Sequence, residues 1–219
     1  MIPRIIHYIW LGPKPIPDLV AENSKVIGPE WEVKVWTDKD FTFNECEWVR
    51  QAKALNLLMY CSDALRFYIL NKYGGVYLDC DVRLHHTPDN LLSLPYCIGN
   101  EEYFDYSPNS GILLSEPGNS VINMFWEMYA KTPLVKNGQY VQDNDTDRLR
   151  DYLKNRKKTM VSSIKEYREH VKDSFCIFEY DGWETFNPKK DYSFAEHLHH
   201  FSWGDLSKGW GTTVKVNIE

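Results

Sequence analysis

The sequence has no C-x-x-C pair, no long apolar run and no excess of basic residues, and each absence removes a class of protein. Its five cysteines are odd in number and scattered, which argues against a disulfide framework or a zinc knuckle and suits a reducing compartment. No stretch approaches the roughly 18–20 apolar residues of a membrane span, and residues 1–9 lack the pattern of a signal peptide. The formal net charge of −6 argues against nucleic acid as a partner. We therefore expect a soluble, cytoplasmic protein.

The 219 residues suffice for one domain with a substantial core. The charge is uneven, because nine lysines and arginines gather between Arg148 and Lys172. The ordinary explanation is a solvated helical face. The alternative is a surface that faces a phosphate-bearing acceptor or the anionic lipid of the inner membrane face, as a peripheral contact.

The N-terminal third alternates between strand and helix patterns. Residues 5–11 are β-branched and aromatic and predict a buried strand, a helical segment follows around residues 18–27, and residues 31–36 predict a second strand. Residues 45–73 are mostly helical in pattern, with a break expected near Ser62, a suitable N-cap. This order predicts an α/β nucleotide-binding fold.

Gly74-Gly75 is expected to end the long helix in a left-handed turn, and residues 76–82 then predict one strand. Alternation along that strand places Tyr77, Asp79 and Asp81 on one polar face at its C-terminal end, where open α/β sheets bind ligands.

Two carboxylates as close as Asp79 and Asp81 repel each other unless a cation lies between them. Mg²⁺ and Mn²⁺ commonly bind one or two carboxylates together with phosphate oxygens. Asp-x-Asp alone is a weak signal. Asp63 and Arg66, three apart on the preceding helix, share a face, and their ordinary interpretation is an intrahelical ion pair.

The later segments are simpler in pattern. Residues 96–98 and 109–115 predict strands, residues 120–131 a helix, and residues 133–172 a polar helical stretch before strands resume at Phe175. There is no internal repeat and no low-complexity tract.

The combined pattern S-D-A-L-R-F-Y-I-L-N-K-Y-G-G-V-Y-L-D-C-D, from Ser62 to Asp81, resembles the DXD-containing sugar transferases of glycosyltransferase family 32. That family includes initiating mannosyltransferases and capsule or lipopolysaccharide transferases, and the clostridial glucosylating toxins carry a related motif. The opening I-P-R-I-I-H-Y-I-W-L-G also looks like the family's first strand. The resemblance covers most of residues 1–115 and a C-terminal fragment.

The resemblance implies a GT-A type nucleotide-sugar-binding fold, that is, an α/β domain with a mixed, mainly parallel sheet flanked by helices. It implies one domain over residues 1–219, with a donor-binding core in 1–115, a helical acceptor or membrane-facing part in 116–175, and a part in 176–219 that closes over the diphosphate. It further implies Mn²⁺ or Mg²⁺ as cofactor and retention of the anomeric configuration.

The roles of the site residues follow from the same resemblance. Trp10 would lie against the base and Tyr77 would support the nucleotide. Asp63 and Arg66 would contact the hydroxyls of the donor sugar. The remaining positions are Asp79, near ribose or sugar and metal-bound water, Asp81, bound directly to the metal, and Asn109, near the transferred sugar.

The C-terminal part of the family pattern is a histidine followed by Ser-Trp. Ser202 and Trp203 match that pair, and His197 or His200 would be the histidine that joins the metal site. A second Ser and Trp, at Ser207 and Trp210, leave the alignment open. The histidine spacing does not fit a standard zinc site.

The expected function is transfer of a sugar from a nucleotide-sugar donor, UDP-linked rather than GDP-mannose, to a glycan or lipid-linked saccharide in surface polysaccharide synthesis. One alternative is a metal-dependent sugar-nucleotide phosphohydrolase, although the second metal-binding group that such enzymes use is missing from the pattern. The other is a non-catalytic carbohydrate-binding module. Such a module explains the high aromatic content of 15%, but it does not explain why Asp63, Arg66, Asp79 and Asp81 occur together.

Overall fold

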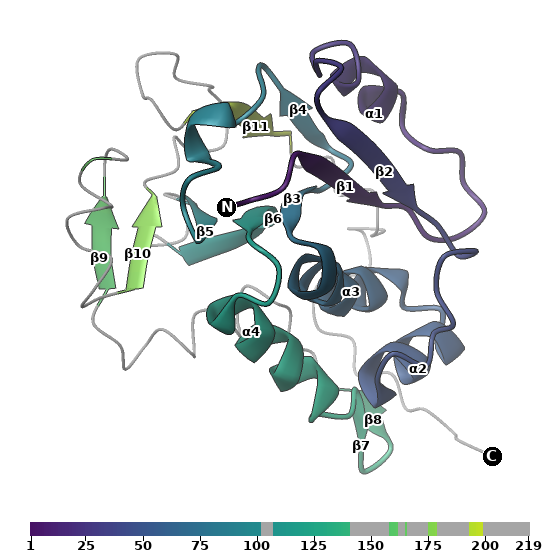
Figure 1. Ribbon diagram of the computed structural model, residues 1–219. Coiled ribbons are helices and arrows are strands. Elements are labelled where there is room, and N and C mark those ends of the chain that lie inside the picture. The colour runs from purple at the N-terminus through teal and green to yellow at the C-terminus, as the bar shows by residue number, and fades with distance from the viewer. Residues whose placement is uncertain (102–106, 141–157, 162–164, 166–174, 179–192, 199–219) are drawn as a thin grey trace.

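The computed structural model describes residues 1–101, 107–140, 158–161, 165, 175–178 and 193–198. Its centre is a five-stranded sheet in the order β2-β1-β3-β6-β5 (Figure 1). The strands are β1 (Ile5–Ile9), β2 (Glu32–Trp36), β3 (Gly75–Leu78), β5 (Tyr96–Glu101) and β6 (Ser107–Ser115). β1 is parallel to β2 and β3, whereas β6 is antiparallel to both β3 and β5. Four strands therefore run in one direction and β6 opposes them.

Both faces of the sheet are covered. On one face, α2 (Glu47–Ala54), α3 (Leu58–Tyr73) and α4 (Ser120–Ala130) bury one apolar cluster against the strands. On the other face, α1 (Asp18–Asn23), the short 3-10 helix η1 (Asp89–Leu91) and the pair β4 (Val82–Leu84) and β11 (Ala195–His197) enclose the second cluster (Figure 1). The predicted α/β architecture, with a mixed sheet flanked by helices, is confirmed.

The helical stretch between residues 45 and 73 does break, but not where the sequence predicted. α2 ends at Ala54 and α3 begins at Leu58, with Asn56 at a φ of 56° between them. Ser62 lies inside α3, where its hydroxyl donates to the carbonyl oxygen of Met59 at 2.8 Å. The predicted N-cap at Ser62 is therefore wrong, because a positive φ at an Asn already turns the chain.

The Gly74-Gly75 pair ends α3 as expected, with positive φ at both residues. The ψ of −162° at Gly74 is extended, however, rather than left-handed helical. A Cβ on Gly75 would lie 2.6 Å from the carbonyl oxygen of Ile5. Glycine at this position lets β3 start directly beside β1.

The single strand predicted over residues 76–82 is two strands. β3 stops at Leu78 and β4 starts at Val82, and residues 79–81 form the turn between them. Tyr77 is also not on a polar face, since it is 1% exposed in the helical layer. Side chains do alternate between the two faces of β3, but the residues on both faces are buried.

The prediction of a helical region over residues 133–172 is wrong for residues 133–140 and 158–161, whereas Lys165, the other described position, is helical. β7 (Val135–Lys136) and β8 (Gln139–Tyr140) form a hairpin, and β9 (Lys158–Val161) pairs in parallel with β10 (Phe175–Phe178). Asn137 and Gly138 both have positive φ, as the Asn-Gly dipeptide of a two-residue hairpin requires. Among the described residues, no helix is long and apolar enough to cross a membrane.

Candidate metal and donor site

The Asp79-Cys80-Asp81 turn lies at the C-terminal end of β3, in the middle of the sheet. Two backbone hydrogen bonds hold it: the amide of Asp79 donates to the carbonyl of Gly111 on β6 at 2.8 Å, and the amide of Val82 donates to the carbonyl of Asp79 at 3.0 Å. The turn therefore carries its two carboxylates on a backbone fixed by the sheet.

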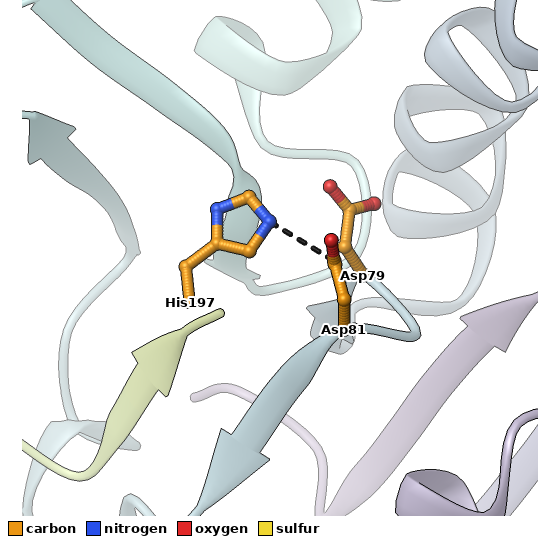
Figure 2. A group of neighbouring side chains, drawn as sticks. All are labelled: Asp79, Asp81 and His197. Atoms are coloured by element: carbon orange, nitrogen blue, oxygen red, sulfur yellow. Dashed lines mark hydrogen bonds and ion pairs between the residues drawn. The ribbon is translucent and has the colours of Figure 1, made fainter. Parts of the chain in front are cut away.

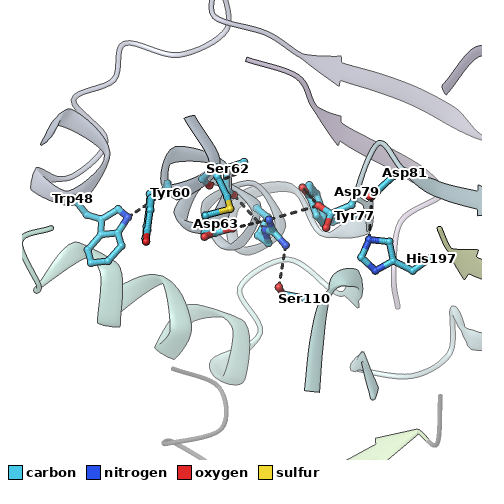
Figure 3. A network of polar contacts seen from close by, with 11 residues as sticks. Trp48, Tyr60, Ser62, Asp63, Tyr77, Asp79, Asp81, Ser110 and His197 are labelled. Carbon is cyan, nitrogen blue, oxygen red and sulfur yellow. Dashed lines mark hydrogen bonds and ion pairs between the residues drawn. The ribbon is translucent and has the colours of Figure 1, made fainter. Parts of the chain in front are cut away.

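Arg66 on α3 connects this turn to the helix. Its guanidinium donates to Asp63 Oδ1 at 2.8 Å and to Ser110 Oγ on β6 at 2.9 Å, and its Nη2 lies 3.5 Å from Asp79 Oδ1 (Figure 3). The side chains of Arg66 and Asp63 are 6% and 5% exposed. The i,i+3 pair is thus an ion pair, as its ordinary interpretation had it, but a buried one that joins the helix to the aspartate turn.

The phenol of Tyr77 donates to the same Asp79 oxygen at 2.6 Å. The guanidinium carbon of Arg66 lies 4.9 Å from the centre of the Tyr77 ring. Burial raises the pKa of Tyr77 well above its usual value, so the phenol is a hydrogen-bond donor at neutral pH.

His197 reaches the turn from a distant part of the chain. β11 pairs antiparallel with β4, and the amide of Leu198 donates to the Asp81 carbonyl at 2.9 Å. The Nε2–H of His197 donates to Asp81 Oδ1 at 3.0 Å. In Figure 2 the imidazole of His197 faces the carboxylate of Asp81, and the carboxylate of Asp79 lies beside it.

These three side chains fit a divalent cation. One ligand atom from each of Asp79, Asp81 and His197 lies within 4.8 Å of the others. Bonds of about 2.1 Å in an octahedron place neighbouring ligand atoms about 3.0 Å apart and opposite ones about 4.2 Å apart, so only a small inward movement is needed. With Asp63 and Arg66, the site carries three carboxylates and one guanidinium, a formal charge of −2 that a divalent ion neutralises.

Cys80 takes no part in this group although it lies between the two aspartates. Its Sγ contacts the carbonyl oxygen of Ile9 at 3.4 Å, within the opposite apolar cluster. Burial raises the pKa of this thiol. Among the described residues, Cys46, Cys61, Cys80 and Cys97 are all free thiols, as the scattered spacing predicted.

Residues 20–97 match the family described as the glycosyltransferase sugar-binding region containing a DXD motif. The match includes α3 and the Asp79-Cys80-Asp81 turn, which carry Asp63, Arg66, Asp79 and Asp81. These residues are similar to a glycosyltransferase sugar-binding region. The resemblance noted in the sequence is thereby confirmed.

Three individual proteins are similar to parts of this chain. Inositol phosphoceramide mannosyltransferase 3 of Schizosaccharomyces pombe is 36% identical over 101 residues, which are 43% of this chain and 28% of that protein. The chain therefore spans less than a third of that relative's length. An uncharacterized glycosyltransferase of Acanthamoeba polyphaga mimivirus is 26% identical over 182 residues, 75% of this chain and 71% of its own. The solved PaToxG glycosyltransferase is 16% identical with a TM-score of 0.46, over 57% of this chain and 59% of that one.

Two predicted site residues, Trp10 and Asn109, lie outside the matched residues 20–97. Trp10, just after β1, is 7% exposed and its indole N–H donates to the carbonyl of Lys14 at 2.8 Å. Asn109 lies in β6, directly before Ser110. Their roles toward base and sugar stay predictions.

Several predicted residues lie outside the described part of the chain. These are His200, Ser202 and Trp203, and nearly all of the basic segment Arg148–Lys172. Ser110, in contrast, was missed: the sequence motif gave no reason to choose it, because only the antiparallel pairing of β6 with β3 brings it to Arg66.

Proposed function

We propose that this chain is a metal-dependent glycosyltransferase with the GT-A arrangement, which moves a hexosyl group from a nucleotide sugar to a hydroxyl of a glycan or lipid-linked saccharide. The observation that carries the proposal is the convergence of Asp79, Asp81 and His197 on one point at the end of β3, beside the buried Asp63–Arg66 pair. A sugar-binding region with a divalent site at this edge of the sheet suits a nucleoside diphosphate sugar.

The metal is Mn²⁺ or Mg²⁺ in this proposal, held by Asp79, Asp81 and His197. When bound, it supplies positive charge to the leaving diphosphate. Whereas the metal acts on the diphosphate, Arg66 acts on the sugar. Its guanidinium is fixed between Asp63 and Asp79 and orients the donor sugar by hydrogen bonds. A buried ion pair is suited to this role because its geometry does not have to be organised during the reaction.

Retention of configuration belongs to the proposal as a same-face attack assisted by the leaving phosphate. Each of the carboxylates Asp63, Asp79 and Asp81 accepts a hydrogen bond from a neighbouring side chain, and the first is nearly closed to solvent. Because this proposal assigns Asp79 and Asp81 to the metal and Asp63 to Arg66, it leaves none of the three carboxylates as the nucleophile. Proton NMR of the first product would establish the anomeric configuration.

The donor and acceptor are named by class. The sequence favoured a UDP-linked sugar, whereas the name of the S. pombe relative favours a mannosyl donor such as GDP-mannose and an inositol phosphoceramide acceptor. Synthesis of a surface polysaccharide, at the cytoplasmic membrane face, is the alternative role that the family resemblance suggests. In that role, the basic residues of segment 148–172 contact anionic lipid. If liposome binding is unchanged after these residues are neutralised, the lipid contact is ruled out.

The test is a thermal-shift panel of UDP, GDP and their common sugars, each with and without Mn²⁺. A ligand that binds only the folded protein raises its stability by about 2.7 kcal/mol at a hundredfold excess over Kd. A Mn²⁺-dependent shift with one nucleotide is expected. No shift with any of them would contradict the proposal and favour a carbohydrate-binding module, and donor consumption that needs no acceptor would favour a phosphohydrolase.

A further inference from the structure

Among the described residues, both contacts to the Asp79 carboxylate use the same one of its two oxygens. Oδ1 accepts from the Tyr77 phenol at 2.6 Å and lies 3.5 Å from Arg66 Nη2. Both partners are buried, whereas the Asp79 side chain is 25% exposed. One oxygen is thus bound to the protein interior, the rotation of the carboxylate is restricted, and the second oxygen remains for an ion.

Tyr77 is rigid enough to impose this orientation. It lies in the central strand β3, opposite His7 of β1 on one side and Leu113 of β6 on the other. Its ring is 1% exposed, with the Arg66 guanidinium near its face. The family resemblance implies that Tyr77 supports the nucleotide. A ring so enclosed offers almost no surface for a direct contact of that kind.

Arg66 is held in a comparable way. Its Nε donates to the backbone carbonyl of Ser62 at 3.3 Å, its Nη2 to Asp63 and its Nη1 to Ser110 Oγ. Ser110 is 3% exposed and comes from β6. Unlike the contacts with Ser62 and Asp63, which lie on α3 itself, this contact ties the guanidinium to β6, and it helps to set how far Arg66 reaches toward the aspartate turn.

We propose that Tyr77 and Ser110 are positioning residues, with Tyr77 fixing the Asp79 carboxylate for the divalent metal and Ser110 fixing Arg66 for the donor sugar. The inference rests on the proposed metal and donor site. It separates two functions that the aspartate motif alone does not: the Tyr77 hydroxyl acts on metal affinity, and the Ser110 hydroxyl acts on recognition of the sugar.

The first experiment measures Mn²⁺ binding by calorimetry, without donor, in the wild type and in Tyr77→Phe. That variant keeps the ring and its contact with Arg66 and removes only the hydroxyl. Loss of a hydrogen bond that orients a metal ligand typically costs about 10- to 100-fold in affinity, and we expect a loss in this range. The matched control is Tyr8→Phe, because Tyr8 is also fully buried and its hydroxyl accepts a hydrogen bond from Asn23 at 3.0 Å.

The outcomes distinguish this role from the proposed function. Unchanged Mn²⁺ affinity in Tyr77→Phe, with binding by the wild type, would overturn the positioning role and leave the metal site standing. An equal loss in Tyr8→Phe would also overturn it, since the effect would then be one of general stability. No Mn²⁺ binding by the wild type would overturn the metal site itself.

The second experiment compares the binding of a nucleotide sugar with that of the nucleoside diphosphate alone, at saturating Mn²⁺. Because a hydrogen bond to a charged group is lost, we expect Ser110→Ala to weaken the nucleotide sugar about tenfold and to leave the nucleoside diphosphate unchanged. Ser110→Thr keeps a hydroxyl and should restore binding. The control is Ser115→Ala, a buried serine of the same strand whose hydroxyl bonds only a neighbouring carbonyl. Equal weakening of both ligands, or no weakening, would contradict the role of Ser110.

Discussion

His197 and Asp81 are 116 positions apart in the chain, yet the imidazole Nε2 of one lies 3.0 Å from a carboxylate oxygen of the other. The pairing of β11 with β4 creates this contact, since His197 lies opposite Val82, the residue after Asp81. A late segment of the chain therefore completes a site that begins in the central sheet. Ion binding and the docking of β11 should stabilise each other.

The nitrogen of His197 should influence which metal the site prefers. Mg²⁺ favours oxygen ligands and water, whereas imidazole raises affinity for transition metals. We expect the protein to bind Mn²⁺ more tightly than Mg²⁺, and His197→Asp, which offers an oxygen instead, to reduce that preference. Calorimetric titration of both ions into both proteins measures the ratio. An unchanged Mn²⁺ to Mg²⁺ ratio would mean that His197 supports Asp81 without touching the ion.

Asp81 should be essential for binding but not for folding. Its side chain is 19% exposed, pairs with His197 at 3.0 Å and belongs to neither apolar cluster, so its truncation creates no cavity in the core. Asp81→Ala is expected to abolish Mn²⁺-dependent nucleotide binding and transfer while changing the melting temperature little. The comparison is Asp18→Ala, which removes an exposed acid at the start of α1. Full activity in Asp81→Ala would remove the metal role of this residue.

The Asp63–Arg66 pair should couple strongly in stability. Removing one partner of a buried ion pair typically costs about 3–5 kcal/mol, because the other charge stays buried. Arg66→Met is expected to destabilise in this range, and Asp63→Asn with Arg66→Met by less than the sum of the single changes. Urea unfolding of the four proteins gives the coupling energy. Additive effects would show that the two charges are solvated separately, against the buried geometry of the pair.

Local chemistry in the sequence was enough to predict the centre of the site. The Gly-Gly turn, the apolar strand after it and the two aspartates placed the carboxylates at the correct edge of the sheet, and the spacing of Asp63 and Arg66 placed both on one face of α3. These predictions depend only on residues within one helix and the strand that follows it. Helical and strand periodicity carry that information directly.

What the sequence did not predict depends on contacts between distant segments. Tyr77 was expected at a polar surface because a strand pattern does not tell whether a second layer covers that face. Ser110 reaches Arg66 only through the pairing of β6 with β3. The end of β3 at Leu78 was missed because Asp-Cys-Asp contains neither Gly nor Pro, the residues that usually mark a turn.

His7 should make stability depend on pH, independently of the site chemistry. The buried imidazole uses both nitrogens: Nε2–H donates to the Gly74 carbonyl at 2.8 Å, and Nδ1 accepts from the Trp36 indole at 3.1 Å. A second proton would displace the Trp36 hydrogen bond, and burial lowers the pKa of His7 from the usual 6.5 to about 4.

Between these two pKa values the unfolded chain binds a proton that the folded protein does not. The free energy of unfolding therefore falls as the pH falls through this window, by up to about 3 kcal/mol. Urea unfolding between pH 7 and pH 4.5 should show a shallower pH dependence in His7→Gln than in the wild type. Equal slopes in His7→Gln and the wild type would contradict the neutral, buried state of this imidazole.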